Sequence, residues 1–402
     1  MKELKLIKYI KNIPKYKIKL NNFSIKILNN LKLELKEIYN KNLNNNDYKI
    51  NIIKNNIVKG LLFNDIPIEI RNIIENEKDN INVIIYEWNK LFKNVNYNIK
   101  LNINYCNKIN NNNMKYVKED KLIEFYILCK TIIDFLINHR EITFKNHNIN
   151  IFLYLTKHIK LVPNNDKEDV IIDYINVNTG ITTFCREKTE INIFRSEEWF
   201  KTLIHESIHN LCIDFGNSNE NYKEILKDIF IIKSDYLLFE VYTETWAEII
   251  QILFLSLFDN FDINHRLIYE FIFSVFQCNK ILSLCTNKKA TYNDLINKNK
   301  NVLKYYKENS NCFCYYVLKM VSLFNINKFI SLFHKNNNDI LQFNKNNNNN
   351  ILNFIDFLKS NYNNHNLIDY INKINTINNY INKQKNTFLN QTLRISIFEI
   401  II

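Results

Sequence analysis

The sequence predicts an α+β fold that is predominantly α: a small sheet with one buried helix, followed by a helical lobe. Apolar residues recur at three- and four-residue spacing over much of the chain, which is typical of amphipathic helices. Short β-branched and aromatic runs gather only between about residues 148 and 194. Over 402 residues we expect a helical N-terminal region (1–147), a central region with the sheet (148–334), and an Asn-rich loop with a C-terminal helical segment (335–402).

The first half of the chain contains the expected sheet. Helical spacing covers residues 23–43, 67–95 and 117–139. An Asn tract at 110–113 interrupts this pattern, because Asn tolerates turn conformations that other residues avoid. The expected strands are 150–155, 175–184 and 190–194.

Helices dominate the rest of the chain. Ser196 is the expected N-cap of a buried helix, since Glu197 and Glu198 suit the positive end of a helix and the apolar pattern opens at Trp199. A second long helix fits residues 235–258, DYLLFEVYTETWAEIIQILFLSLF. Further helical patterns cover 265–284, 300–333 and 366–384, whereas the Asn-rich tract 335–350 predicts a polar loop or a disordered insert.

The composition is strongly biased, with Asn, Lys and Ile dominant and only 3 Gly and 3 Pro. Such a bias is expected from an A+T-rich genome, such as that of a large DNA virus or a protist. The net charge of +12 comes from scattered Lys, while Arg is scarce. Because base readout favours Arg, the charge does not favour nucleic-acid binding as a main role.

The cysteines and the apolar runs predict a cytoplasmic protein without a membrane partner. None of the 8 Cys has the spacing of a zinc knuckle or a redox pair, so we expect mostly reduced core thiols. The N-terminal residues alternate Lys with apolar residues and do not resemble a signal peptide. The most apolar run, 249–258, is too short to cross a bilayer.

The motif IHESIHN carries the chemistry. His205 and His209 are four residues apart, so one helical turn places both imidazoles on the same face with Glu206 beside them. Zinc prefers neutral imidazole nitrogen, and two His leave positions for one more protein ligand and a water. Glu206 can act as the general base on that water. The alternative is a purely structural role, in which the helix is buried and both His side chains are satisfied by hydrogen bonds.

This stretch, from about 150 to 260, resembles the zincin metallopeptidases, which carry HExxH on a helix that follows an edge strand and a second strand. The resemblance makes 148–334 a zincin-like catalytic region. In that superfamily the edge strand binds an extended peptide by strand addition. The segment 176–184 is the candidate here, with Asn178, Thr179, Gly180, Ile181 and Thr182 at its centre.

The third metal ligand decides the subgroup. Cys212 and Phe215 occupy the positions where metzincins carry Gly and His, which excludes that subgroup, and Cys185 lacks the Gly-rich motif of the peptide deformylases. The gluzincin type takes a Glu from a later helix, often with another acid four residues on. Glu244 followed by Glu248 matches that pattern, with Glu244 as ligand and Glu248 supporting a ligand His.

Other assignments remain open. Glu248 follows Ala247 in a way similar to the ligand Glu of lethal-factor-like toxins, which would exchange its role with Glu244. Glu224 and Asp228 have the same four-residue spacing but lie in a polar, Asn-rich segment. Candidates for stabilising an oxyanion are His265, Tyr236 and Tyr242, and the sequence does not rank them.

These residues predict a zinc metallopeptidase that binds one Zn²⁺ per chain and hydrolyses a peptide or protein substrate. The main alternative is a non-catalytic zincin-like domain with a structural or protein-binding role. Glu206 argues against it, because a metal kept only for stability needs no such carboxylate. A second alternative, a basic protease associated with nucleic acid, would need a clustered Lys face.

Overall fold

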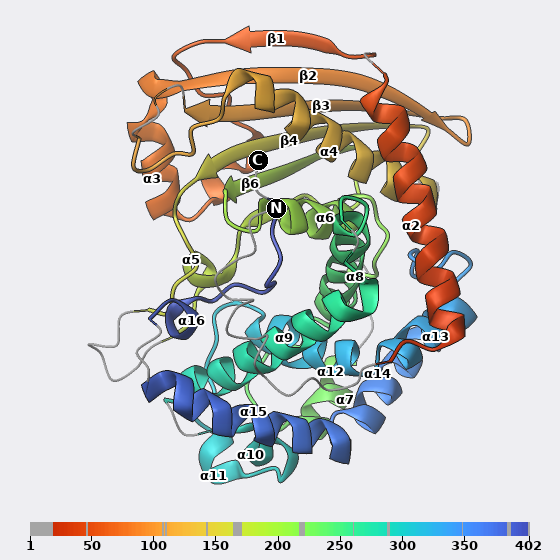
Figure 1. Ribbon diagram of the computed structural model, residues 1–402, viewed down its shortest axis with the longest axis vertical. Helices are drawn as coiled ribbons and strands as arrows, with labels where there is room; N and C mark the ends of the chain where they lie inside the picture. The colour runs from red at the N-terminus through yellow and green to blue at the C-terminus, as the bar shows by residue number, and fades with distance from the viewer. Residues whose placement is uncertain are drawn as a thin grey trace.

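A six-stranded mixed sheet organises the first half of the chain in this computed structural model (Figure 1). The structure describes residues 19–45, 47–106, 108, 111–141, 144–163, 171–216, 222–259, 261–287, 290–347, 349–383 and 387–400. The strands are β1 (Lys49–Ile53), β2 (Ile81–Phe92), β3 (Val95–Cys106), β4 (Asn146–Thr156), β5 (Gly180–Thr182) and β6 (Lys188–Arg195). Their order is β1-β2-β3-β4-β6-β5, with β3/β4 and β4/β6 parallel and the other pairs antiparallel.

Helices make up most of the remaining structure, which confirms the α+β, predominantly α fold class. They are α2 (Asn22–Leu43), α3 (Ile68–Asn76), α4 (Glu119–His139), α5 (Tyr174–Val177), α6 (Trp199–Asn210), α7 (Tyr222–Ile229), α8 (Leu238–Leu255), α9 (Ile263–Cys285), α10 (Tyr292–Ile296), α11 (Lys300–Leu303), α12 (Lys319–Phe324), α13 (Ile326–Asn336), α14 (Asn350–Asn361), α15 (His365–Lys383) and α16 (Thr387–Gln391). Short 3₁₀ turns η1 (Leu61–Asp65) and η2 (Lys78–Asn80) and a π-helix η3 (Phe313–Leu318) complete them.

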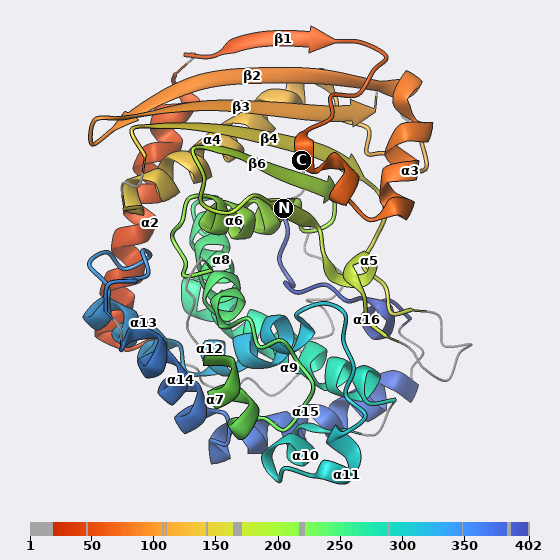
Figure 2. The same cartoon turned by 180° about the vertical axis from the view of Figure 1, so that it is seen from behind.

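The sheet is covered on both faces, as Figure 2 shows. Helices α4 and α6 pack on one face, and α2 packs on α4. All three share a single large apolar core with the helical lobe. Helix α3 and η1 cover the other face, where Ile70 and Ile74 meet Val83 and Tyr154 in a second, smaller core. Burial on both faces explains why β2 opens with six consecutive buried residues instead of an alternating pattern.

That double burial makes part of the N-terminal prediction wrong. The expected helices at 23–43 and 117–139 are present as α2 and α4. Of the helix expected at 67–95, only the first part is helical, as α3, and the second part is strand β2. A continuous apolar run fits a buried strand and a buried helix equally well, and the Ile and Val content decides for the strand. The sheet therefore crosses the expected boundary at 147, inside β4, and is larger than predicted.

Two later predictions also change. The helical pattern over 300–333 divides into α11, η3, α12 and part of α13. Residues 337–347 of the Asn-rich tract form a loop, which was one of the two expected alternatives, but the loop is anchored in the core. Leu341, Gln342 and Phe343 are buried, and the Phe343 N–H donates to the carbonyl of Ile213 at 2.7 Å. These three residues therefore anchor the loop in the core, although the many Asn residues around them predict a polar loop.

Helix α9 is long and apolar enough to cross a membrane by composition. In the structure, 83% of its most apolar window is buried inside the protein, against α12, α8 and α15. A helix in the core of a folded lobe can be as long and as apolar as a membrane-spanning helix. The burial of α9 inside the protein therefore accounts for its apolar composition.

We predict that His139 makes the stability of the protein depend on pH. Its ring bridges Glu34 on α2 and Asp339 in the Asn-rich loop, at 3.1 and 2.9 Å. Burial alone would lower its pKa, but the two carboxylates outweigh burial and raise it to about 9. The stabilisation is therefore complete below the unfolded pKa of about 6.5 and is lost as pH rises through 9.

The measurement is urea unfolding of the wild-type protein and of His139→Gln at pH 6 and at pH 9.5. The difference in unfolding free energy should be about 1–2 kcal/mol at pH 6, since both acids are partly exposed, and should shrink at pH 9.5. His334→Gln, on α13 and without a carboxylate partner among the described contacts, is the control. A difference that grows with pH would refute this role.

Candidate metal centre

Helix α6 lies under β6 and is buried along all 12 of its residues. It begins after Glu198, whose backbone is left-handed at φ 56°, so Ser196 is not the N-cap that the sequence predicts. Helix α6 packs on α8, β5 and β6. This packing turns the face that carries His205 and His209 toward the first turns of α8.

Three electron-pair donors converge where α6 faces α8. The Nε2 atoms of His205 and His209 lie 3.0 Å apart, and Oε2 of Glu240 lies 3.2 Å from each of them. Among the described residues, these three form the one group of His, Cys, Asp and Glu side chains that could hold a metal ion. All three side chains are buried.

The outer nitrogens of both rings face carboxylates. Oε2 of Glu244 lies 2.8 Å from Nδ1 of His205, although the ring N–H is not well aligned with that oxygen. Oδ2 of Asp214 lies 2.5 Å from Nδ1 of His209. Lys201 in turn holds the other oxygen of Glu244 at 2.5 Å. Carboxylates beside both Nδ1 atoms favour the tautomer with the ring proton on Nδ1, and in that tautomer the Nε2 lone pairs are directed at one another.

That arrangement fits a metal ion. Ligands about 2.0–2.1 Å from a tetrahedral metal lie about 3.3 Å from one another, close to the observed 3.0 and 3.2 Å. Two imidazole nitrogens and a carboxylate oxygen at such distances repel unless a cation or a shared proton lies between them. The donor set, its spacing and the oriented outer nitrogens together are those of a three-ligand metal site.

Burial and pairing determine the pKa values. Burial has the largest effect on the imidazoles of His205 and His209 and would lower their pKa, but the facing carboxylates outweigh it and raise both. Burial would raise the pKa of Glu240, yet the two rings lower it to about 2. Protons on this cluster compete with a metal ion for the same nitrogens, so metal binding releases protons.

The third converging acid is Glu240, one turn before the predicted ligand Glu244. The assignment of Glu244 as ligand stays a prediction, but in this structure Glu240, on the same helix, is the acid that meets both Nε2 atoms. Glu244 supports His205, the role predicted for Glu248. Glu248 lies further along α8, where Lys319 contacts it at 3.2 Å. Glu224 pairs with Lys227 on α7 at the surface.

Glu206 faces a small cavity beside the metal site. Burial raises the pKa of its carboxyl, in spite of the two neighbouring imidazoles. No hydrogen bond or ion pair from another described residue reaches this carboxylate, and it is only 8% exposed. A buried acid without a partner is costly, so its position points to a functional role.

Tyr315 of η3 lines the same cavity, with its ring centroid 6.0 Å from that of His205. The sequence did not single it out, because it lies in a run of apolar residues with no pattern of its own. The expected oxyanion candidates lie elsewhere: Tyr236 bonds to backbone carbonyls at 230 and 232, Tyr242 bonds to the carbonyl of Leu341, and His265 is exposed beside Asp262.

The expected strand at 175–184 is shorter in the structure. The first residues of the expected strand belong to helix α5, and only Gly180, Ile181 and Thr182 form β5. Asn178 and Thr179 precede the strand. The carbonyl of Asn178 accepts a hydrogen bond from Nε of Arg195 at 2.8 Å, which fixes the approach to β5.

Strand β5 is the edge of the sheet next to α6. It pairs with β6 through Thr179 and Thr183, so the alternation of an antiparallel ladder turns the backbone groups of Gly180 and Thr182 away from β6. Within the described part of the chain, no strand pairs with that outer side. A Cβ at Gly180 would lie 3.0 Å from Cγ of Glu206, so glycine lets the strand approach the helix.

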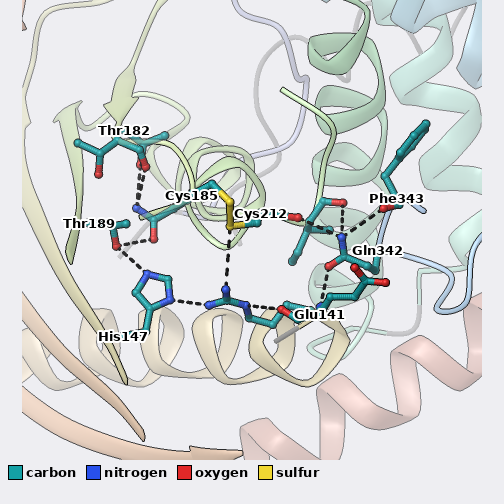
Figure 3. The surroundings of a disulfide bond; sticks show 12 residues. Glu141, His147, Thr182, Cys185, Thr189, Cys212, Gln342 and Phe343 are labelled. Carbon is teal, nitrogen blue, oxygen red and sulfur yellow. Dashed lines mark hydrogen bonds between the residues drawn. A yellow bond between two sulfur atoms is a disulfide. The ribbon is translucent and has the colours of Figure 1, made fainter. Parts of the chain in front are cut away.

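A disulfide, Cys185–Cys212, joins the residues after β5 to the end of α6 (Figure 3). Both cysteines have a left-handed backbone, at φ 47° and 62°, which is uncommon for residues other than glycine. Gln342 donates to the carbonyl of Cys212 at 3.0 Å. The other six cysteines are buried thiols, so the expectation of mostly reduced core thiols is confirmed, and the sequence did not predict this pair.

No protein-family model matches this chain, and neither a curated protein nor a solved structure is found to be similar to it. The resemblance to the zincins therefore stays a prediction, carried by the motif and by the geometry around it.

We predict that His205, His209 and Glu240 bind Zn²⁺ together. Replacing any one of them by Ala should abolish tight binding of about one Zn²⁺ per chain, because two remaining donors are too few. Glu244→Ala should weaken affinity by about 10- to 100-fold, since it only orients His205. Titration against a chromogenic zinc chelator measures both effects.

Glu248→Gln is the matched control on the same helix and should leave the affinity unchanged. If Glu240→Ala keeps tight binding while Glu244→Ala loses it, the ligand is Glu244 after all.

The disulfide should stabilise both the fold and the metal site. It closes a loop of 27 residues, for which chain entropy predicts about 3–4 kcal/mol. The Cys185→Ser/Cys212→Ser variant should lose about that much unfolding free energy. It should also bind Zn²⁺ more weakly, because Asp214 follows Cys212 by two residues.

Thiol titration of the denatured, unreduced protein checks the bond directly. Six reactive thiols are expected, and eight would show that the pair is not joined. Cys129→Ala, which removes a buried free thiol on α4, is the control and should leave metal affinity unchanged.

Proposed function

We propose that this protein is a zinc metallopeptidase of gluzincin-like type that hydrolyses peptide bonds with Glu206 as general base. The observation that carries the proposal is the convergence of His205, His209 and Glu240 beside a buried carboxylate without a partner. The order of edge strand, strand and motif helix in β5, β6 and α6 supports it, because the zincins share that order.

Zinc suits the donor set, since it accepts two imidazoles and a carboxylate in a tetrahedral site with one position left for water or substrate. When bound, the ion supplies Lewis acidity, which polarises the substrate carbonyl and makes water a stronger nucleophile at neutral pH. The residues around it then need only move protons and orient the substrate.

Glu206 takes the proton from the attacking water and passes it to the leaving amine, as a general base and then a general acid. Tyr315 donates its hydroxyl hydrogen to the oxygen that becomes negative in the transition state. Burial raises the pKa of Tyr315 well above its usual value, and the nearby Glu240 acts in the same direction, so the hydroxyl keeps its proton. Asn311 points its amide at the phenol oxygen at 3.5 Å, which leaves the hydrogen of that hydroxyl free to donate.

The substrate is an extended peptide added to the outer edge of β5. The backbone groups of Gly180 and Thr182 supply the hydrogen bonds. The absence of a side chain at Gly180 lets β5 lie close to Glu206, so a peptide added to β5 lies near the general base. Such binding depends on the peptide backbone, so it suits many sequences. The unpaired carboxylate of Glu206 favours this function over a non-catalytic module, in which the residue would have no task.

We expect the Zn²⁺-loaded protein to cleave unfolded protein or peptide substrates. Glu206→Gln should lower kcat by about 10²–10⁴-fold while keeping zinc. Tyr315→Phe should lower kcat by about 10²-fold with little change in KM, because its hydrogen bond forms only in the transition state. Mass spectrometry of the products and zinc analysis measure the two effects.

Tyr316→Phe is the matched control, since the neighbouring hydroxyl bonds to the carbonyl of Leu393 and does not line the cavity. Full activity of Glu206→Gln at unchanged zinc content would refute the proposed function.

A further inference from the structure

A small cavity lies between β5, α6, η3 and the C-terminal segment 393–398. Its walls include Gly180, Lys201, Thr202, Glu206, Tyr315 and Ile395. Its volume is about 30 Å³, room for roughly one water molecule or a methyl group. The wall opposite the general base is therefore supplied by a residue almost 190 positions further along the chain.

Ile395 is held from both sides by buried charged groups. Oε1 of Glu198 accepts hydrogen bonds from the N–H of Ile395 at 3.0 Å and of Ser396 at 2.6 Å. Nζ of Lys319 donates to the carbonyl of Ile395 at 2.9 Å. With its N–H and its carbonyl both bound, the backbone at Ile395 cannot withdraw without leaving buried charges unpaired.

The rest of the C-terminal segment is bound in the same way. Glu270 of α9 accepts from the N–H groups of Ile397 and Phe398 at 3.0 and 3.1 Å, and Gln251 of α8 donates to the carbonyl of Phe398 at 2.9 Å. The segment is therefore a fixed part of the lobe, and the Ile395 side chain is a rigid wall.

The two lysines on the cavity walls offer no free positive charge to a substrate. Lys160 pairs with Glu198 at 2.7 Å, and Lys201 pairs with Glu244 at 2.5 Å, so both ammonium groups on its walls are already neutralised. The carboxylate of Glu206 would repel an acidic side chain. Among uncharged side chains, the cavity can discriminate only by size and shape.

A peptide added to β5 would place a side chain at this cavity. Gly180 lines the cavity with its backbone, because a Cβ there would lie only 2.7 Å from Cγ2 of Thr202. The alternation of a strand sends every second side chain of the added peptide toward α6. The side chain that enters is the one next to the scissile bond, because Glu206 lines the same cavity.

We propose that Ile395 is a specificity-determining residue, which restricts a position flanking the cleaved bond to small side chains such as Gly, Ala or Ser. This inference rests on the proposed peptidase function. A larger side chain would have to displace Ile395 and with it the hydrogen bonds of the segment.

The test uses the full-length Zn²⁺-loaded protein and a peptide mixture randomised on both sides of the cut, with the products identified by mass spectrometry. The wild-type protein should cleave next to Ala at least about tenfold faster, in kcat/KM, than next to Leu. Ile395→Ala should reduce or reverse that ratio. Ile397→Ala, which removes the same atoms from the same segment without touching the cavity, should keep the wild-type ratio.

The milder pair Ile395→Val and Ile397→Val repeats the comparison if the Ala variants do not fold. Cleavage by the wild-type protein without a size preference, or equal shifts in both variants, would overturn the role of Ile395 and leave the peptidase function intact. No cleavage of any peptide by the zinc-loaded protein would instead refute the proposed function, and this inference with it.

Discussion

The close approach of three like electron-pair donors is the constraint on which the centre of this structure depends. His205, His209 and Glu240 lie within 3.2 Å of one another in the interior. They stay there because α6 packs on α8, and because Glu244 and Asp214 prevent the rings from turning their lone pairs elsewhere. The packing of the two helices thus holds the three donors together, and a proton or a cation shared between them would stabilise the cluster.

The sequence predicts which face of a helix carries metal ligands more reliably than it predicts which turn of that helix meets the metal. Acids at 240, 244 and 248 repeat every four residues, so all three share one side of α8 and any neighbouring pair fits a ligand with its supporting acid. Which pair meets the His residues depends on the position of α8 along the axis of α6. The side chains that pack between the two helices determine that position. Tyr315 was missed for a similar reason: only tertiary folding brings η3 to the site.

The sequence predicted the elements whose apolar residues repeat with a helical period and failed where an apolar run has no period. Helices α2, α4 and α8 carry periodic patterns and were predicted, whereas β2 lies between α4 and α3 and shows no period. The bond between Cys185 and Cys212 spans 27 residues and cannot be read from spacing. The cytoplasmic address expected from the N-terminal residues and the cysteine spacing stays a prediction, and the redox state of this pair bears on it, because disulfides persist mainly in oxidising surroundings.

The buried C-terminal segment has a consequence for biosynthesis. Contacts such as Ile395 with Glu198 join residues 197 positions apart, so α6 leaves the ribosome long before the wall of its cavity exists. Throughout that interval the buried acids Glu198 and Glu270 have no backbone N–H groups to bind. A nascent chain therefore exposes an incomplete centre, and the cavity beside Glu206 closes only after residue 398 has been translated.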